Sequence, residues 1–596
     1  MLNSIKETLS VGRTMAPLLT KAARSGQLFS PACELTPPND DVVCRYDVQV
    51  PVEDGFYLTA NIFLSRAAQA AGTRLPVIMS GHPYDNNKLP ARGRTPLGGA
   101  PIQYRLLPQA GRPSFSTITS WEAPDPDFWV GAGYAVVNLN LPGYGTSQGP
   151  PTILSRHQAK CFYEAIEWIA RQPFCNGRVG LSGVSFLAIS QYHVATCEHY
   201  GGPPPSLKCI SPWEGMSNLY REVACRGGVE DIGFLPFWYN MDVKSALGER
   251  AADFLKYNEV TPADGLAKHP LYDQYWEQMA APLEKINLPM LVCAAFGDHG
   301  MHTSGSFAAF TRAKSAQKWL YTHRDGKWDV YYSDAVKQLT REFMDCFLKD
   351  DTSSGFLDRA LVRLEVRSSR DVIHEVREEQ AWPLERTQYR PLFLDAESLS
   401  LRGSAPATPQ AARHAGQGGR TVFTYRFAED TELTGYMKLR LWVQALGAKA
   451  DNPTPDDPAP DDLIVFAAVN KLDRNGRSVR FRGPLGCAED MVARGCARAA
   501  RRELDTKAST EWLPVFTGTS HQPLKPGEIV PLDIALEPSC TFFAAGESIE
   551  LIVSADEIVR IPPFHKDARP NRGVHVFHAG GSYDSHLLIP VINPPA

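Results

Sequence analysis

The first 350 residues alternate short apolar segments with longer segments of helical spacing. Six apolar segments have the length and the flanking turn residues of buried strands: 76–80, 134–141, 178–181, 207–211, 290–296 and 318–323. Helical spacing is clearest at 305–316 and 334–348. This order is typical of a mostly parallel sheet with helices on both faces. The pattern therefore predicts an α/β domain.

A long interval without a clear strand, residues 212–285, separates the fourth strand from the fifth. Its helical spacing predicts a cap over the carboxyl edge of the sheet. We expect its aromatic side chains to line a pocket, in particular Trp213, Tyr220, Phe237 and Trp238. For each aromatic residue the alternative is ordinary packing in a core.

Beyond residue 350 the pattern changes to alternating polar and apolar positions separated by turn signals such as Asn475-Gly476. This change predicts an antiparallel β domain. We divide the chain into an N-terminal arm at 1–40, an α/β domain at 41–211 and 286–350, a helical cap at 212–285 and an all-β domain at 351–596.

Composition narrows the class of protein. The chain has 596 residues, of which 43% are hydrophobic and 21% charged, and no apolar run reaches the roughly 20 residues that span a bilayer. We expect no membrane partner. The net charge of −5 does not favour nucleic acid, and we interpret the one basic run, 494–502, as a solvated turn. Charged residues interrupt the N-terminus, so we expect no secretion signal and a cytoplasmic location.

The twelve cysteines lack the CxxC or Cys/His spacing of a zinc site. We expect free buried thiols and no metal, with a bridge between Cys487 and Cys496 left open.

The candidate chemistry starts at Ser185, in the stretch Gly183-Val184-Ser185-Phe186 directly after an apolar strand. A serine hydroxyl becomes a nucleophile only when a base accepts its proton, a carboxylate orients that base and donors stabilise the oxyanion. A strand followed by a sharp turn and a helix is the setting of the G-x-S-x-G motif. Leu187 stands where the motif has its last glycine, so the match is incomplete.

The order of residues along the chain supports the motif, because α/β-hydrolases supply serine, acid and histidine in that order. Asp298 follows the strand at 290–296, and His323 ends the strand at 318–323. We predict a triad of Ser185, Asp298 and His323. His302 is expected in the substrate pocket. Tyr84, with the backbone amide of Phe186, is expected to form the oxyanion hole.

Several segments resemble the cocaine esterase and X-Pro dipeptidyl-peptidase family of serine hydrolases. They include VEDGFYLTANIF, HPYD, GYAVVNLNLPGYGTSQG, QPFCNGRVGLSGVSF, SPWEGMSNLYRE, FGDHGMHTSGSFAAF, RELDTKAST and GGSYDSHLLIPVI. The resemblance implies an α/β-hydrolase core with an inserted helical cap and a C-terminal jelly-roll domain. It also implies the triad and oxyanion residues named above, and a homo-oligomer such as a dimer.

Together these features predict a serine hydrolase that cleaves an ester or amide bond of a small organic substrate through an acyl-enzyme at Ser185, without a cofactor. Acyl transfer and an inactive hydrolase fold that only binds ligands are the alternatives. The aromatic cap favours a bulky apolar substrate group. Four acidic residues of the cap could hold a substrate amine, although we expect them at the surface: Glu214, Glu222, Glu230 and Asp231.

Overall fold

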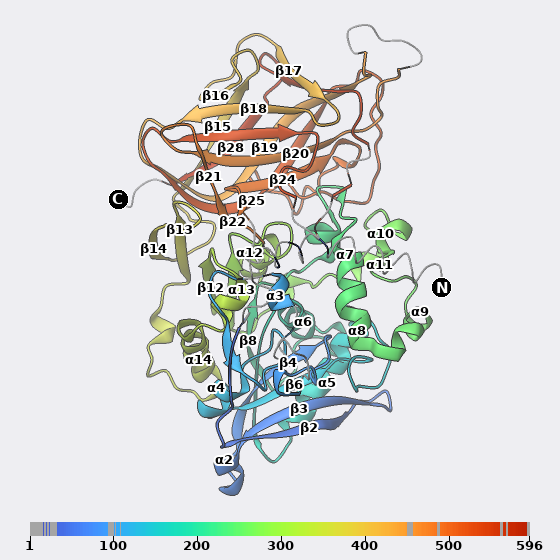
Figure 1. The fold of residues 1–596 in the computed structure, drawn as a ribbon, viewed down its shortest axis with the longest axis vertical. Helices are drawn as coiled ribbons and strands as arrows, with labels where there is room; N and C mark the ends of the chain where they lie inside the picture. Colours follow the sequence, from blue (N-terminus) through green and yellow to red (C-terminus); the bar gives the residue numbers. More distant parts are fainter. Residues whose placement is uncertain are drawn as a thin grey trace.

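The computed structural model describes residues 33–592 apart from 93–100, 102, 108, 450–456, 485–488, 561–563, 565 and 568–569, together with positions 16, 20 and 23. The predicted N-terminal arm lies almost wholly outside the described residues, as does Cys487. Figure 1 shows an α/β body below and an all-β body above it.

One mixed sheet forms the centre of the α/β body. In spatial order its strands are β2 (Val42–Pro51), β3 (Tyr57–Ser65), β6 (Ala135–Asn140), β4 (Leu75–His82), β7 (Cys175–Val184), β8 (Leu207–Trp213), β11 (Met290–Ala295), β12 (Lys318–His323), β13 (Val362–Arg367) and β14 (Ile373–Glu379). The strands from β6 to β13 run parallel. All six strands predicted in this region are confirmed. The sheet also continues past the predicted border at residue 350, because β13 pairs with β12.

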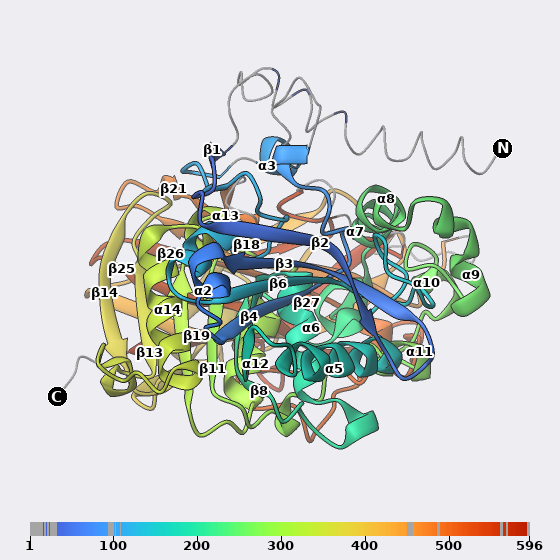
Figure 2. The same cartoon turned by 90° about the horizontal axis from the view of Figure 1, so that it is seen from below.

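Helices cover both faces of this sheet (Figure 2). They are α4 (Pro126–Gly131), α5 (Arg156–Ala170), α6 (Phe186–Ala195), α12 (Thr303–Arg312), α13 (Lys327–Tyr331) and α14 (Asp334–Leu348). Alternate strand residues enter opposite cores: Met290 and Val292 join the core that includes α5, α6 and α12, whereas Leu291 joins the core beneath α14. Because both faces are buried, the strands read as nearly continuous apolar runs.

Short α-helices are spread over the later part of the interval predicted as a cap. They are α7 (Phe234–Trp238), α8 (Lys244–Leu247), α9 (Phe254–Tyr257), α10 (Gly265–Lys268) and α11 (Gln274–Glu277), at the right in Figure 1. A small hairpin, β9 (Cys225–Arg226) with β10 (Val229–Glu230), precedes them. The spacing of apolar residues gave no sign of these two short strands.

The all-β body consists of antiparallel strands packed around one apolar core. One group comprises β15 (Thr387–Asp395), β17 (Gln410–Ala415), β19 (Thr431–Leu446), β25 (Val530–Phe543), β27 (Val574–Ala579) and β28 (His586–Ile592). The other comprises β18 (Arg420–Arg426), β20 (Ile464–Leu472), β24 (Ala493–Arg498) and β26 (Ser548–Ser554). The strand β16 (Ser400–Arg402) pairs with both β15 and β18. The predicted all-β domain is confirmed.

The basic run at 494–502 is not the solvated turn that we predicted. Arg494 lies 2.9 Å from Asp490, Arg498 lies 2.6 Å from Asp462, and Arg501 is only 5% exposed. The guanidinium groups of these arginines therefore pair with carboxylates of the protein itself. In the described part of the chain, ten cysteines are free thiols, and nine of these are buried: Cys161, Cys175, Cys197, Cys209, Cys225, Cys293, Cys346, Cys496 and Cys540. None of the helices described there combines the length and the apolar character that a bilayer-spanning segment requires.

Candidate active site

Ser185 occupies the sharp turn between β7 and α6. Its φ of 59° lies in the left-handed region that non-glycine residues seldom adopt, and α6 begins at the next residue, Phe186. The amide of Phe186, the first residue of the helix, has no acceptor within the helix, so it is available beside Ser185. The predicted turn is therefore present, with the serine side chain at the amino end of a helix.

Two glycines make room for the residues that depart from the usual motif. A β-carbon at Gly183 would lie 2.5 Å from Cβ of Leu187, and one at Gly215 would lie 3.1 Å from Cβ of Ala188. Leu187 is thus tolerated because position 183 carries no side chain. Ala188 fits the helix–strand contact because position 215 carries none.

A hydrogen-bonded chain links Ser185 to a histidine and an acid. Oγ of Ser185 is 3.2 Å from Nε2 of His302, and Nδ1 of His302 is 2.5 Å from Oδ2 of Asp298. His302 and Asp298 are 1% and 2% exposed. Burial and the positive charge of Lys327 lower the pKa of His302 to about 4, against the opposing effect of Asp298. At neutral pH this imidazole is neutral and can accept a proton.

His323 does not occupy the position that the sequence predicted. Its Nε2 is 2.9 Å from Oε1 of Glu214, and both side chains are buried. His323 is the last residue of β12, and its ring lies near Tyr321, two residues earlier on the same face of the strand. His302, which we had placed in the substrate pocket, also lies between the serine and the acid. Spacing of four residues from Asp298 was the available signal, because side chains at i and i+4 meet when a helical turn forms.

Tyr84 and Phe186 lie together beside Ser185. Their rings are 6.3 Å apart, edge to face, and both residues line the same cavity as Ser185. The phenol oxygen of Tyr84 accepts a hydrogen bond from Nε1 of Trp238 at 3.3 Å. Burial, with the nearby charge of Glu122, raises the pKa of Tyr84 well above its ordinary value. Tyr84 therefore keeps its proton and can donate it in a hydrogen bond.

A cavity of about 90 Å³ lies over these groups. Phe237, Trp238 and His302 line it, as the sequence predicted. Trp213 and Tyr220 do not. Trp213 is packed inside the sheet against Tyr321, and Tyr220 donates a hydrogen bond to the carbonyl of Pro270. For Trp213 the alternative of core packing describes the structure, whereas Tyr220 lines a separate cavity of about 780 Å³.

Three ionisable residues to which no sequence motif pointed also line the cavity. Glu122 accepts a hydrogen bond at 2.9 Å from Nε1 of Trp328, and Nζ of Lys327 is 3.5 Å from the same carboxylate. Burial raises the pKa of Asp242 to about 7, although a hydrogen bond from Gln103 opposes the shift. The cavity is thus apolar over most of its wall and polar at a few points.

The β body supplies part of this site. Phe564 lines the cavity and stacks on Phe234 of the cap with ring centroids 5.1 Å apart. The loop that carries Asp298 and His302 is held from the same side, because Glu537 accepts a hydrogen bond from the amide of Gly300 at 2.9 Å. Nδ1 of His299 lies 3.2 Å from Oδ2 of Asp490. The position of His302 therefore depends on both bodies.

The acidic cap residues that we expected at the surface are mostly inside. Glu214 is 1% exposed and pairs with His323; Asp231 is 2% exposed and lies 3.2 Å from Nζ of Lys566. Glu222 accepts hydrogen bonds from Ser217. Among the described residues, each of these three acids has a partner within the protein, and none lines the cavity over Ser185.

Two protein-family models match this chain, one over each body of the structure. The family model for the X-Pro dipeptidyl-peptidase (S15 family) matches residues 54–326, and the model for the X-Pro dipeptidyl-peptidase C-terminal non-catalytic domain matches residues 354–588. A solved CocE/NonD family hydrolase from Staphylococcus aureus is 32% identical, with a TM-score of 0.83 over 95% of this chain and 100% of that one. The chain belongs to the CocE/NonD hydrolase family. The family predicted from the sequence and its α/β-hydrolase fold with a C-terminal all-β domain are thereby confirmed.

Other relatives of this CocE/NonD family member are more distant. Cocaine esterase from Rhodococcus sp. is 24% identical over 413 residues, which cover 61% of this chain and 64% of that enzyme. A candidate serine esterase of Mycobacterium bovis is 27% identical over 191 residues, which cover 32% of this chain and only 27% of that protein. A solved α-amino acid ester hydrolase shares the fold, with a TM-score of 0.64 at 16% identity.

Proposed function

We propose that this CocE/NonD family member is a serine hydrolase that cleaves an ester or amide bond of a small organic substrate through an acyl-enzyme at Ser185. The observation that carries the proposal is the buried chain from Ser185 through His302 to Asp298, with contacts of 3.2 Å and 2.5 Å. This chain supplies a nucleophile, a base and an acid that orients the base. His302 takes the role that the sequence had given to His323.

In the proposed reaction Nε2 of His302 accepts the Ser185 proton while Oγ attacks the substrate carbonyl carbon. Asp298 accepts a hydrogen bond from Nδ1–H and stabilises the imidazolium. The amide of Phe186 and the hydroxyl of Tyr84 donate to the oxyanion of the tetrahedral intermediate. His302 then protonates the leaving alcohol or amine, and the acyl group stays on Oγ.

Water completes the cycle by the reverse sequence of proton transfers. His302 accepts a proton from water, the hydroxide attacks the acyl carbon, and the proton returns to Oγ as the acid leaves. The protein's own residues suffice for these steps.

The lining of the cavity supports a substrate in which the group next to the carbonyl is compact and apolar. Aromatic side chains from three sources surround it, namely Trp121 of the α/β body, Trp238 of the cap and Phe564 of the β body. Its volume of about 90 Å³ favours a small-molecule substrate over a folded polymer. A dimer and a cytoplasmic location remain predictions from the sequence.

The test uses the full chain, a chromogenic ester and a fluorophosphonate, which reacts only with an activated serine. We expect stoichiometric labelling, a burst of product equal to the enzyme concentration, and loss of both in Ser185→Ala. Labelling or turnover that survives in Ser185→Ala would overturn the proposal. An added alcohol or amine separates hydrolysis from acyl transfer, because transfer would give the new ester or amide as the main product.

A further inference from the structure

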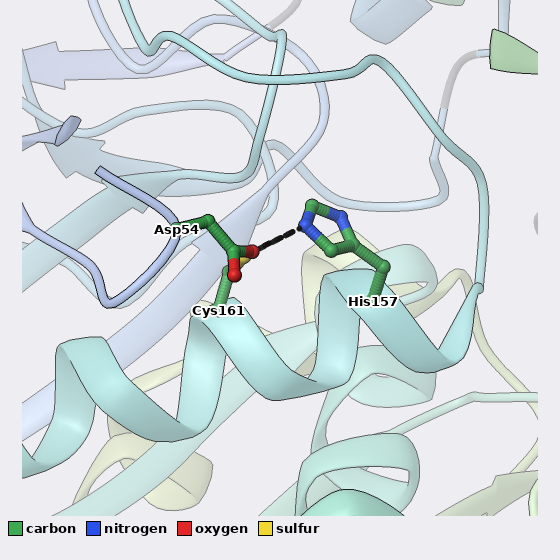
Figure 3. Close-up of side chains that lie close together, drawn as sticks. All are labelled: Asp54, His157 and Cys161. Carbon is green, nitrogen blue, oxygen red and sulfur yellow. Dashed lines mark hydrogen bonds and ion pairs between the residues drawn. The ribbon is translucent and has the colours of Figure 1, made fainter. Parts of the chain in front are cut away.

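A second group of reactive side chains lies where α5 meets the turn between β2 and β3. Asp54 belongs to that turn, and His157 and Cys161 are four residues apart on α5, so they share one face of the helix. Figure 3 shows the three side chains pointing toward one another. None of them lines the cavity over Ser185. We refer to these three residues as the α5 cluster.

The distances within the α5 cluster are close to those around a tetrahedral metal ion. Nε2 of His157 is 3.6 Å from Sγ of Cys161 and 2.9 Å from Oδ2 of Asp54, and one ligand atom from each residue lies within 4.8 Å of the others. Zinc bonds at tetrahedral angles place nitrogen about 3.6 Å from sulfur and about 3.4 Å from oxygen. The nitrogen–sulfur edge already fits. The nitrogen–oxygen edge must open by about 0.5 Å as the metal replaces the hydrogen bond.

The chemical types of the three ligand atoms indicate which metal ions the α5 cluster would bind. A thiolate and an imidazole favour zinc and its neighbours among transition metals over magnesium and calcium, which prefer oxygen ligands alone. The side chains of His157 and Asp54 are 31% and 36% exposed, whereas Cys161 is fully buried. An ion can therefore enter from solvent, with the sulfur at the inner end and the outer position left for water.

A neighbouring lysine orients the carboxylate. Nζ of Lys160 is 3.0 Å from Oδ1 of Asp54 and 2.6 Å from Oε1 of Glu164, so Lys160 holds the oxygen that does not face His157. Oδ2 of Asp54 is left for the metal. Outer contacts of this kind fix the direction of a metal ligand and are common around protein metal sites.

We propose that Asp54, His157 and Cys161 bind one divalent transition-metal ion of the zinc class, with a solvent molecule as fourth ligand. On binding, a metal–sulfur bond replaces the S–H bond of Cys161, whose proton passes to solvent. A metal–nitrogen bond replaces the Nε2–H bond of His157, whose proton is exchanged through solvent for one on Nδ1, so the ring stays neutral and no electron is transferred. The charges of thiolate, carboxylate and dication then sum to zero. The ion fastens the β2–β3 turn to α5, the helix that packs against β7 and α6 around Ser185. It is a structural site, separate from the proposed hydrolysis.

Cobalt(II) gives a direct test on the purified full-length protein, because a cobalt–thiolate bond produces a charge-transfer band and four-coordination produces intense visible bands. We expect one equivalent of cobalt to give both features and one equivalent of zinc to displace it. Zinc should also raise the melting temperature. Hydrolysis by the loaded and metal-free proteins should have the same kcat, because the α5 cluster does not line the substrate cavity.

Variants locate the ion. Cys161→Ala should abolish the charge-transfer band and the zinc-dependent stabilisation, and His157→Gln should weaken binding at least tenfold. Cys44→Ala is the matched control, because Cys44 is a free, half-buried thiol of the neighbouring β2 outside the cluster. Absence of the band in the wild-type protein would overturn the proposal. Its persistence in Cys161→Ala, or its loss in Cys44→Ala, would overturn it equally.

Discussion

Two of the buried histidines, His302 and His323, give the sharpest prediction, because the sequence and the structure assign them different roles. We compare His302→Gln with His323→Gln. His302 contacts Oγ of Ser185 at 3.2 Å and Asp298 at 2.5 Å, whereas His323 contacts Glu214 at 2.9 Å. Only the first substitution removes the proton acceptor of the nucleophile.

The two substitutions should change different quantities: His302→Gln should lower kcat, whereas His323→Gln should lower the free energy of unfolding. Loss of a base in such a triad lowers kcat by roughly 10⁴- to 10⁶-fold, which corresponds to about 5 to 8 kcal/mol of transition-state stabilisation. The oxyanion donors leave a residual rate. His323→Gln instead breaks a buried ion pair and leaves a buried carboxylate, at a cost of about 3–5 kcal/mol in folding free energy. It should lower the melting temperature by several degrees while kcat/KM changes less than tenfold.

The assay is steady-state hydrolysis of one chromogenic ester, with each rate divided by the concentration of folded protein from circular dichroism. A thermal melt of each variant measures the stability effect separately. Retained activity in His302→Gln together with loss in His323→Gln would refute the assignment and restore the triad expected from chain order.

Three further predictions concern charge and shape around the cavity. Lys327→Met should move the acidic limb of kcat/KM to higher pH, because removal of the positive charge raises the pKa of His302 above about 4; Lys327→Arg should leave the limb in place. Asp242→Asn should stabilise the protein above pH 7 and not below pH 4, because burial raises the folded pKa of Asp242 to about 7 and ionisation of the buried acid costs at most about 4 kcal/mol. Chemical denaturation at pH 4 and pH 8 measures the change in the free energy of unfolding. Equal changes at both pH values would contradict the prediction. Phe564→Ala should raise KM for bulky acyl esters more than for acetyl esters with little change in kcat, because Phe564 lines the cavity and contacts Phe234; an equal effect on both esters would argue against a binding role.

The pattern of apolar and polar residues along the chain was enough to locate the strands and the candidate nucleophile, Ser185. A strand buried on both faces must be apolar along its length, so the six segments of the α/β domain stand out against their polar borders. Ser185 was identified for the same reason, since its turn joins such a strand directly to a helix. Leu187 and Ala188 could not be judged from the motif alone. Their fit depends on Gly183 and Gly215, and the second of these comes from a different strand end.

The amino-acid pattern alone predicted the family, the fold class, the turn at Ser185 and the strand end that carries Asp298. It did not determine which histidine meets the serine, because chain order cannot distinguish His323 at a strand end from His302 at the start of the next helix. Tertiary structure decided that point: the β body holds the loop at Gly300 through Glu537, while Glu214 takes up His323. It also brought Glu122, Lys327 and Phe564 to one cavity, since contacts between residues so distant in the chain depend on packing rather than on local periodicity.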